Sequence, residues 1–215
     1  MRSWDFDLSK RCEHVRPTQC LQLLGFSCGN EDIDTFFHLE VSDYETELMA
    51  KTYAFTDPER GNRVVSVFSL SNDSIKTDTL TNQVRNRLQR SIPNAKRKHS
   101  YPAVLLGQLG ADIRYRGLGV GTQTLQYVMK WMTHPDNKTG CRFLVVDALN
   151  VDAVLKFYTD NGFAYLYPSE DCERDARRIQ ESRLRTRTMY CDLRLWLLRQ
   201  TAGLSGKNIT KYSRV

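Results

Sequence analysis

Apolar residues recur at helical spacing in the first quarter of the chain, behind Asn30, which can act as an N-cap. The positions that form this stripe are Ile33, Phe36, Phe37, Val41, Tyr44 and Leu48. They predict a helix, or a pair of helices, over residues 31–49. Two runs typical of strands follow at 51–56 and 63–70, separated by a segment rich in turn-forming residues. We therefore expect these two runs to pair as a hairpin.

A spacing of four between apolar residues predicts another helix, at residues 80–92. Its apolar stripe consists of Leu80, Val84, Leu88 and Ile92. Asp78 or Thr79 can cap its start, and Pro93 ends it. The same helix carries Arg85, Arg87 and Arg90.

Two nearly continuous apolar runs, at 103–111 and 142–148, are typical of strands that are covered on both faces. The helical segment between them turns four apolar residues inward, namely Leu125, Val128, Met129 and Met132. A strand, a helix and a second strand in this order predict a parallel strand pair.

A last helix is predicted over residues 151–160, with Tyr158 on its apolar stripe and Gly162 at its end. The segments that complete the pattern are a strand at 163–167, a charged loop at 170–185 and a final strand at 186–197.

Composition indicates a globular protein with one core. The chain has 215 residues, of which 40% are hydrophobic and 26% charged. We expect a single domain over residues 1–200 and a polar tail over 201–215. The N-terminus lacks the apolar stretch of a secretion signal and no run reaches the length of a membrane span, so we expect a cytoplasmic protein without a membrane partner.

Positive charge is concentrated in one part of the chain. The net charge is +6, from 31 basic and 25 acidic side chains. No Asp or Glu lies between Asp78 and Asp112, and the six cations of that stretch account for the whole excess. They are Arg85, Arg87, Arg90, Lys96, Arg97 and Lys98. Such a basic patch is typical of a surface that meets a polyanion, and a solvated surface helix is the alternative.

The six cysteines do not predict a disulfide framework. They are spread along the chain without a CxxC pair, so we expect reduced thiols. Cys12 and His14 are close enough in sequence to share a metal, but two ligands without a second pair do not make a zinc site. We expect no metal.

The sharpest local feature is a glycine-rich loop between a predicted strand and a predicted helix. Its residues are Arg116, Gly117, Leu118, Gly119, Val120, Gly121 and Thr122. Glycines leave backbone N–H groups unshielded and the helix dipole favours an anion at the helix start, so a pyrophosphate fits this loop. The spacing GxGxG without a following Lys matches neither the dinucleotide motif nor the P-loop. A strand-to-helix turn without a ligand is the alternative.

Read as R-x-x-G-x-G, the loop resembles the CoA pyrophosphate motif of the GNAT superfamily of N-acetyltransferases. The run 105–112 resembles the family strand that splays from its neighbour and pairs its backbone with pantetheine, and 157–163 resembles the family ending F-Y-x-x-x-G-F. The resemblance implies an α/β (α+β) fold: a mixed, mostly antiparallel sheet with a central splayed parallel strand pair and helices on both faces. It also implies acetyl-CoA as co-substrate, bound by the loop and by the backbone of Leu109, Gly110 and Ala111.

Within this resemblance, Tyr158 is the candidate general acid, because the family places this hydroxyl near the CoA sulfur. Reference pKa values of about 10 for a phenol and 8.5 for a thiol make the proton transfer only modestly uphill. A core aromatic is the alternative reading of Tyr158. Asn150 is not counted as a cofactor ligand, since it precedes the tyrosine by eight residues where the family has seven.

No residue stands out as a general base, and Asp112 and Asp147, at strand ends, stay candidates. At pH 7 a lysine amine is neutral in about one molecule in two thousand, whereas an α-amine is neutral in about a tenth to a sixth. A site without a base therefore suits an α-amine, and one next to an ester still better.

A narrower resemblance covers nearly the whole chain. Residues 25–30, followed by 33–37, resemble the F-x-C-G opening of GNAT-type toxins from bacterial toxin-antitoxin pairs, and the segments 80–98, 101–109 and 145–148 resemble that group as well. These toxins acetylate the α-amine of aminoacyl-tRNA, which implies tRNA binding by the basic patch. The chain departs from the group at Gln108 and Gly110, where Arg and Val are usual, and in the segment 170–187.

The partners to expect are acetyl-CoA, aminoacyl-tRNA, a ribbon-helix-helix antitoxin and a second copy of the chain. Two other functions stay open. One is a housekeeping acetyltransferase for a small amine or a protein N-terminus. The other is a catalytically silent CoA-binding interaction module.

Overall fold

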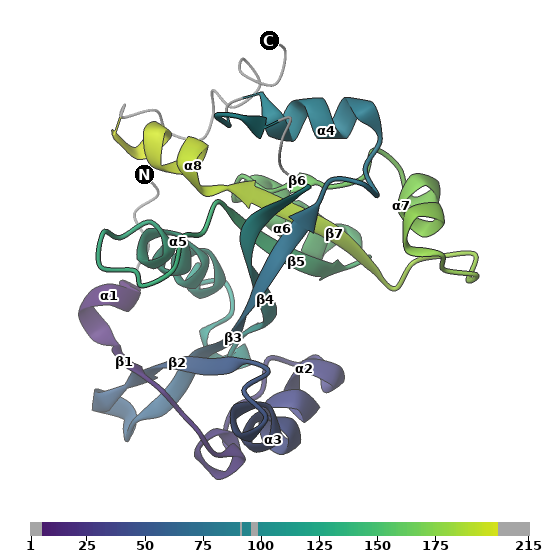
Figure 1. Ribbon diagram of the computed structural model, residues 1–215. Coiled ribbons are helices and arrows are strands. Elements are labelled where there is room, and N and C mark those ends of the chain that lie inside the picture. Colours follow the sequence, from purple (N-terminus) through teal and green to yellow (C-terminus); the bar gives the residue numbers. More distant parts are fainter. Residues whose placement is uncertain (1–5, 91, 96–98, 202–215) are drawn as a thin grey trace. The chain divides into compact units, whose positions relative to one another are not determined.

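The computed structural model describes residues 6–90, 92–95 and 99–201 (Figure 1). The predicted tail from residue 202 onward and Lys96, Arg97 and Lys98 of the basic patch lie outside the described residues. The chain divides into two compact units. The first comprises Met1–Asn72 and Leu106–Lys130, and the second comprises Asp73–Leu105 and Trp131–Val215. That the two units fold as a single domain stays a prediction.

The first unit is built around a β-hairpin. Its elements are α1 (Leu8–Arg11), β1 (Glu13–Val15), η1 (Cys20–Leu23), α2 (Glu31–Thr35), η2 (Phe36–Glu40), α3 (Val41–Thr46), β2 (Lys51–Asp57), η3 (Pro58–Arg60), most of β3 (Arg63–Lys76), the second half of β4 (Ser100–Ala111), η5 (Ile113–Tyr115) and α5 (Val120–Met132). The predicted helix over 31–49 is thus a succession of three short helical segments.

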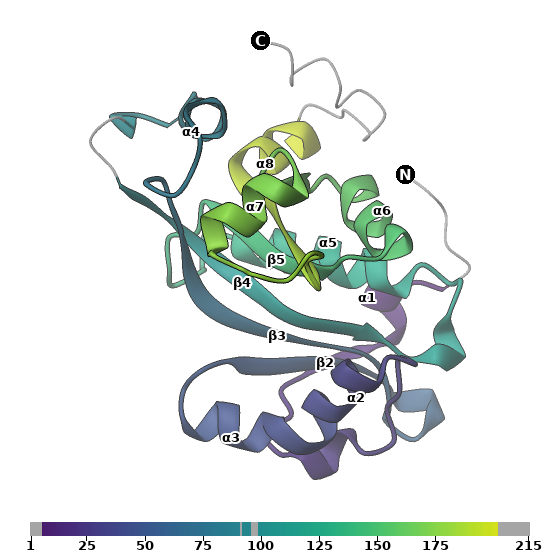
Figure 2. The same ribbon diagram turned by 90° about the vertical axis from the view of Figure 1, so that its right-hand side faces the viewer.

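The local signals of the sequence act as expected here. Asn30 caps α2 by accepting a hydrogen bond from the Ile33 amide at 3.1 Å. Strands β2 and β3 pair antiparallel, and the turn between them uses left-handed backbone at Gly61 and Asn62. Helices α2 and α3 lie on one side of this hairpin (Figure 1, Figure 2). The other side meets α5, where the rings of Phe55 and Tyr127 are 4.9 Å apart.

The second unit holds the remaining elements. They are α4 (Asn82–Gln89), the first half of β4, β5 (Phe143–Leu149), α6 (Asp152–Asp160), β6 (Ala164–Tyr165), α7 (Glu170–Arg177), β7 (Thr186–Asp192) and α8 (Leu193–Thr201). Phe143 and Val145 of β5 share a core with α4, and the alternating Leu144 and Val146 are buried as well. Strand β5 is therefore covered on both faces, as its apolar run predicts.

The strand order is β1-β2-β3-β4-β5-β7-β6. Strands β4 and β5 are parallel, with Ala103–Leu105 opposite Phe143–Val145, whereas β1 with β2, β2 with β3, β5 with β7 and β6 with β7 are antiparallel. The parallel pairing ends at Leu105, although β4 continues to Ala111. The predicted mixed sheet with one splayed parallel pair is confirmed.

Three predicted boundaries are wrong. Helix α4 is capped by Thr81, whose hydroxyl accepts from the Val84 amide, and not by Asp78 or Thr79. The segment predicted as a charged loop contains α7. The last strand ends at Asp192, where its carboxylate accepts from the Leu195 amide and starts α8, so residues 193–197 are helical.

Helix α7 forms because charge and capping agree with a helix, although only two of its residues, Cys172 and Ala176, are apolar and pack against the core. Ser169 caps it by accepting from the Cys172 amide at 3.1 Å. Acidic residues fill its first turn and basic residues its last turn, which complements the helix dipole. The prediction used the spacing of apolar residues, which does not detect a helix defined by its cap and its charges.

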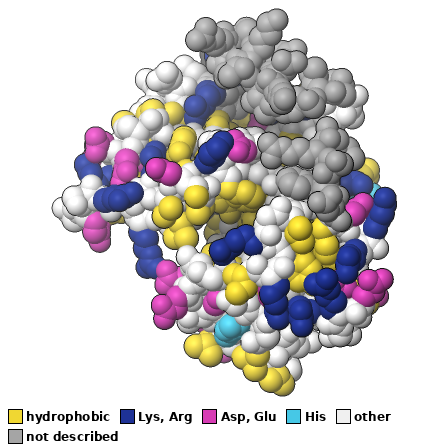
Figure 3. All heavy atoms as spheres, turned by 180° about the vertical axis from the view of Figure 1, so that it is seen from behind, with side chains coloured by type: hydrophobic (Ala, Val, Ile, Leu, Met, Phe, Trp, Pro, Cys, Tyr) yellow, Lys and Arg dark blue, Asp and Glu magenta, His cyan; other side chains and the backbone are white. Residues whose placement is uncertain are grey.

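The described surface is mixed in character. None of the described helices combines the length and the apolarity that a membrane span requires. On the face shown in Figure 3, Lys and Arg side chains (dark blue) occur at several separate places, with hydrophobic side chains between them.

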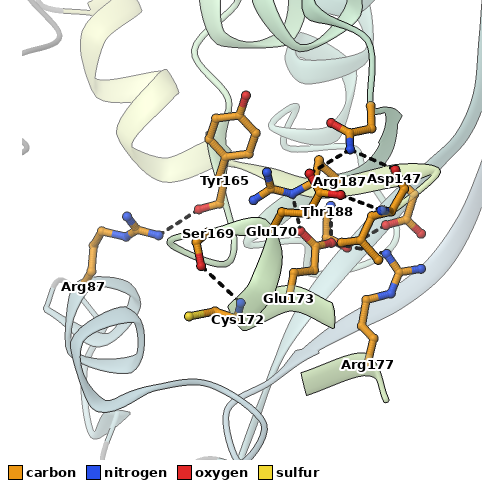
Figure 4. Close-up of polar contacts among 12 residues, drawn as sticks. Arg87, Asp147, Tyr165, Ser169, Glu170, Cys172, Glu173, Arg177, Arg187 and Thr188 are labelled. Carbon is orange, nitrogen blue, oxygen red and sulfur yellow. Dashed lines mark hydrogen bonds and ion pairs between the residues drawn. The ribbon is translucent and has the colours of Figure 1, made fainter. Parts of the chain in front are cut away.

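A buried carboxylate fastens α7 to β7 (Figure 4). Glu173 is fully buried and accepts hydrogen bonds from Arg187 Nε and the Thr188 amide, both at 2.7 Å, and from Arg177 Nη1 at 3.3 Å. The Arg187 guanidinium also lies 4.8 Å from the centre of the Tyr165 ring. These three hydrogen bonds offset the free-energy cost of removing the Glu173 carboxylate from water.

Replacing Glu173 with Gln is expected to lower the free energy of unfolding by about 3 kcal/mol, because the buried Arg187 loses its counter-charge. Urea denaturation measures the change. Asp171→Asn is the matched control on the same helix, since its ion pair with Arg174 is largely exposed and we expect a loss below about 1 kcal/mol. Equal losses in the two variants would contradict this account of α7.

Candidate functional site

The glycine-rich loop joins η5 to α5 in the first unit. Gly117 and Gly119 have φ values of +82° and +74°, a conformation that residues with a side chain rarely adopt. Helix α5 then begins at Val120. Among the described residues, no acceptor is found for the backbone amides of Gly119, Val120 and Gly121. Amides at the start of a helix are the donors that bind anions.

Two polar side chains near the start of α5 connect the loop and the helix to other segments of the first unit. The Gln123 side chain donates to the carbonyls of Phe6 at 2.9 Å and Leu118 at 3.4 Å, and accepts from the Leu8 amide at 2.8 Å. The buried Thr124 hydroxyl lies 2.8 Å from that of Ser66. Sequence reasoning missed Gln123, because two of its three partners, Phe6 and Leu8, are more than a hundred residues away in the chain.

Arg116 opens the loop and is exposed. Its Nη2 atom donates to the Cys28 carbonyl at 3.4 Å. The guanidinium is therefore held by one long hydrogen bond and lies at the surface. In the sequence, Arg116 directly precedes the glycines of the loop.

The predicted pantetheine strand is the second half of β4. Leu109, Gly110 and Ala111 lie on it beyond the last residue that pairs with β5. At Gly110 the backbone touches the Phe26 ring so closely that an added Cβ atom would lie 2.7 Å from Phe26 Cζ. The glycine at this position therefore has a packing reason.

Tyr158 lies in the second unit, on α6. Its ring is buried between Phe157 and Phe163, with ring centres 5.1 and 5.3 Å away. Gly162, with φ of +89°, turns the chain so that the Phe163 amide donates to the Tyr158 carbonyl at 3.0 Å. Burial raises the pKa of the Tyr158 hydroxyl above its ordinary value. The raised pKa keeps the hydroxyl protonated at neutral pH. No described residue forms a hydrogen bond with that hydroxyl, so it can donate to an external acceptor.

The three arginines of α4 differ in what they contact. Arg85 donates to the carbonyls of Thr77 at 3.0 Å and Leu80 at 3.2 Å. Arg87 donates to the Tyr165 carbonyl at 2.9 Å, as Figure 4 shows, and its guanidinium lies 5.7 Å from the centre of the Tyr190 ring. Arg90, the C-cap of α4, is exposed. Its backbone amide donates to the Asn86 carbonyl at 3.1 Å, and its side chain makes no hydrogen bond or ion pair with any described residue.

The two candidate bases differ in exposure. Asp112 is buried; burial would raise its pKa, but hydrogen bonds from the Arg114 side chain and backbone outweigh this effect and lower the pKa. A carboxylate with a lowered pKa is a weak base. Asp147 is exposed and accepts from the Thr188 hydroxyl at 2.7 Å (Figure 4).

Asn150 forms hydrogen bonds within the second unit. Its side-chain amide donates to the Glu170 carboxylate at 3.1 Å and to the Leu184 carbonyl at 2.9 Å. It therefore ties the end of β5 to the segment around α7. This agrees with leaving Asn150 out of the cofactor ligands.

The described cysteines are free thiols. Within the described residues, no three His, Cys, Asp or Glu side chains are grouped so that they could hold a metal ion. His14 instead stacks on the Tyr53 ring, with centres 5.6 Å apart.

No protein-family model matches the sequence, and no curated protein matches it. Solved structures match over most of their length. A tyrosine-to-phenylalanine mutant of KacT is 20% identical with a TM-score of 0.64, covering 87% of this chain and 98% of its own. AtaT complexed with acetyl-methionyl-tRNAfMet is 17% identical with a TM-score of 0.63 and the same coverage.

A third structure is a tyrosine-to-phenylalanine mutant of the AtaT toxin, bound to the C-terminus of the antitoxin AtaR and to acetyl-CoA. It is 17% identical with a TM-score of 0.59, and the match covers 89% of this chain and 99% of that one. The chain has the fold of these proteins, in agreement with the fold that the sequence predicts.

Proposed function

We propose that this protein is an N-acetyltransferase that moves the acetyl group of acetyl-CoA to the α-amine of aminoacyl-tRNA, as a toxin. The observation that carries the proposal is the loop at residues 116–122, whose unpartnered amides open helix α5 in a fold that it shares with AtaT. AtaT has been solved with acetyl-CoA and with an acetylated aminoacyl-tRNA.

The cofactor is assigned to the loop by charge and by backbone geometry. A pyrophosphate carries negative charge that the amides of Gly119, Val120 and Gly121 and the start of α5 can stabilise. Arg116 adds a guanidinium group, which suits the recognition of phosphate oxygens. Glycine at 117 and 119 allows the phosphate oxygens to approach the backbone closely.

The reacting end of the cofactor is assigned to β4. In the reaction the neutral acceptor nitrogen bonds to the thioester carbon and the carbon–sulfur bond breaks. The thiolate takes up one proton, and the nitrogen releases one proton to solvent as it becomes an amide. Amides between Leu109 and Ala111 can stabilise the negative charge that forms on the carbonyl oxygen. Tyr158 donates a hydrogen bond to the departing sulfur and is the source of its proton. Its raised pKa keeps the hydroxyl protonated at neutral pH but makes full transfer to a thiolate more uphill than for an ordinary phenol, so the hydrogen bond in the transition state supplies the stabilisation.

The α-amine acceptor is supported by the weakness of the buried candidate base, Asp112. The lowered pKa of Asp112 leaves it unable to deprotonate an amine efficiently. An α-amine has a reference pKa of about 7.7 to 8.0 and is partly neutral without help, unlike a lysine amine at about 10.4. A small amine or a protein N-terminus would meet the same requirement, so the acceptor has to be tested directly.

RNA binding is assigned to the basic patch, with Arg90 as its leading described member. Arg90 is exposed, whereas Arg85 and Arg87 contact carbonyl groups of the protein. Lys96, Arg97 and Lys98 follow it in sequence without an intervening acid. A ribbon-helix-helix antitoxin and a second copy of the chain complete the proposed partners.

Gly119→Glu is expected to abolish acetyl-CoA binding, because it places a side chain at a left-handed position and a negative charge where the pyrophosphate lies. Calorimetric titration with acetyl-CoA measures the affinity, and circular dichroism checks that the variant is folded. Gly61→Glu is the matched control, since Gly61 has a similar φ of +70° in a turn outside the proposed site. Unchanged affinity in Gly119→Glu would overturn the cofactor assignment.

Tyr158→Phe is expected to lower kcat by about a hundredfold with little change in acetyl-CoA affinity, because the proton is needed only as the thiolate forms. Steady-state kinetics together with binding calorimetry separate the two quantities. If affinity falls and turnover survives, Tyr158 is a packing residue only.

The pH profile gives a second measure of the same assignment. We expect kcat/KM to rise with pH as the acceptor amine loses its proton and to level off by about pH 8, because the neighbouring ester lowers the amine pKa below the reference value of about 7.7 to 8.0. It then stays level to about pH 10, because burial raises the pKa of Tyr158 above its ordinary value. A descending limb between pH 8 and 9 would contradict the role of Tyr158 as the acid.

We expect labelled acetyl-CoA, supplied in parallel with charged tRNA, deacylated tRNA, peptides and polyamines, to label charged tRNA alone. Label on peptide or polyamine only would favour the housekeeping enzyme. Binding of acetyl-CoA without any transfer would favour the silent module.

Arg90→Ala should weaken tRNA binding and reduce the logarithmic salt slope by about one unit, as expected for one lost phosphate contact. The control is Arg194→Ala, which removes an exposed arginine on α8.

A further inference from the structure

The segment of residues 25–30, here called the 25–30 loop, lies against the end of β4 and the start of the glycine-rich loop. Three of its carbonyl groups accept hydrogen bonds from residues 113–116. The Ser27 carbonyl accepts from the Ile113 amide at 2.9 Å and the Gly25 carbonyl from Arg114 Nη2 at 2.8 Å. The third is the bond from Arg116 to the Cys28 carbonyl. The 25–30 loop therefore follows the backbone that leads into the proposed pyrophosphate site.

The 25–30 loop is itself held in one conformation. The Asp34 carboxylate accepts from the Ser27 hydroxyl at 2.7 Å and from the Cys28 amide at 2.8 Å. Burial would raise the pKa of Asp34, but these hydrogen bonds outweigh burial and lower it. The carboxylate is thus charged at neutral pH and the loop is fixed to α2.

Two glycines mark where the 25–30 loop and its neighbour fit together. Gly29 has φ of +79°, and an added Cβ would lie 3.2 Å from both Arg116 Nη2 and Ile113 Cγ2. The Phe26 ring packs so closely on Gly110 that a methyl group at position 110 would lie 2.7 Å from Phe26 Cζ. Phe26 is 1% exposed and packs edge-on against Phe37, 5.9 Å away, so the ring has no free space to move into.

We propose that the 25–30 loop is a positioning element of the acetyl-CoA site, an inference that rests on the proposed function. Phe26, pressed on Gly110, sets the direction of the amides between Leu109 and Ala111 at the reacting end. The carbonyl of Cys28, with Gly29 beside it, sets the guanidinium of Arg116 at the pyrophosphate end. Gly110 and Phe26 form a complementary pair, because a Cβ atom at position 110 would lie 2.7 Å from Phe26 Cζ.

The energetic reason is the precision that such a site needs. Donors that stabilise a developing charge have to be held within about 0.5 Å of the productive geometry. Strand β4 has no pairing with β5 beyond Leu105, so the sheet on that side does not fix these amides. The side chain of Phe26 supplies that constraint from the neighbouring loop.

Gly110→Ala tests the reacting end. The methyl group displaces the Phe26 ring or the strand, and we expect kcat to fall at least about tenfold with acetyl-CoA affinity within about twofold of wild type. Phe26→Leu removes the ring atoms that the methyl group meets, so the double variant should recover most of the lost kcat. Gly140→Ala is the matched control, since no atom lies within 4 Å of its added Cβ.

Gly29→Ala tests the pyrophosphate end. The strained position and the contact with Arg116 should weaken acetyl-CoA binding about tenfold while kcat at saturating acetyl-CoA stays near wild type. A folded Gly29→Ala variant with wild-type affinity, or a Gly110→Ala variant whose loss of kcat is not recovered by Phe26→Leu, would overturn the positioning role. These results leave the proposed function standing as long as Gly119→Glu abolishes binding. Unchanged binding in Gly119→Glu removes the proposed function itself.

Discussion

The reacting end of the proposed acetyl-CoA site depends on where the parallel pairing of β4 and β5 ends. A backbone amide inside a protein has to find an acceptor, and in a continuous sheet the neighbouring strand supplies it. Here β4 pairs with β5 only through Ala103–Leu105, and it then runs on for six further residues. In that second half β4 still adjoins β3 on one edge, whereas its other edge is not paired with β5. The proposed site places an extended ligand with carbonyl groups of its own along that second edge.

The glycine-rich loop follows directly from the same strand. Beyond Ala111 the chain makes one short turn, η5, and two left-handed glycines redirect it into α5. The backbone thus passes from donors along a strand to donors at a helix start within about a dozen residues. A ligand with a peptide-like arm and a diphosphate matches that order of donors.

The basic patch illustrates how a charge count differs from a binding surface. Six cations without an intervening acid stand out in the sequence, yet two of the three described arginines of α4 contact carbonyl groups of their own unit. Arg87 in particular links α4 to β6 and lies over Tyr190, so its loss would disturb packing as well as charge. Arginine is versatile enough to serve either purpose, and only its surroundings decide which.

The sequence by itself determined the order of the elements, the hairpin, the parallel strand pair and the glycine-rich loop. These features depend on local periodicity, on turn residues and on glycine, which act over a few neighbouring positions. It did not determine α7 or α8, because both begin at side-chain caps, Ser169 and Asp192, in segments without a clear apolar stripe. Nor did it determine what Phe26, Asn150 or Gln123 contact. The contacts of Phe26 with Gly110, of Asn150 with Glu170 and of Gln123 with Phe6 each join residues at least 20 positions apart. Only the tertiary structure brings such groups within the distance of a hydrogen bond or a packing contact.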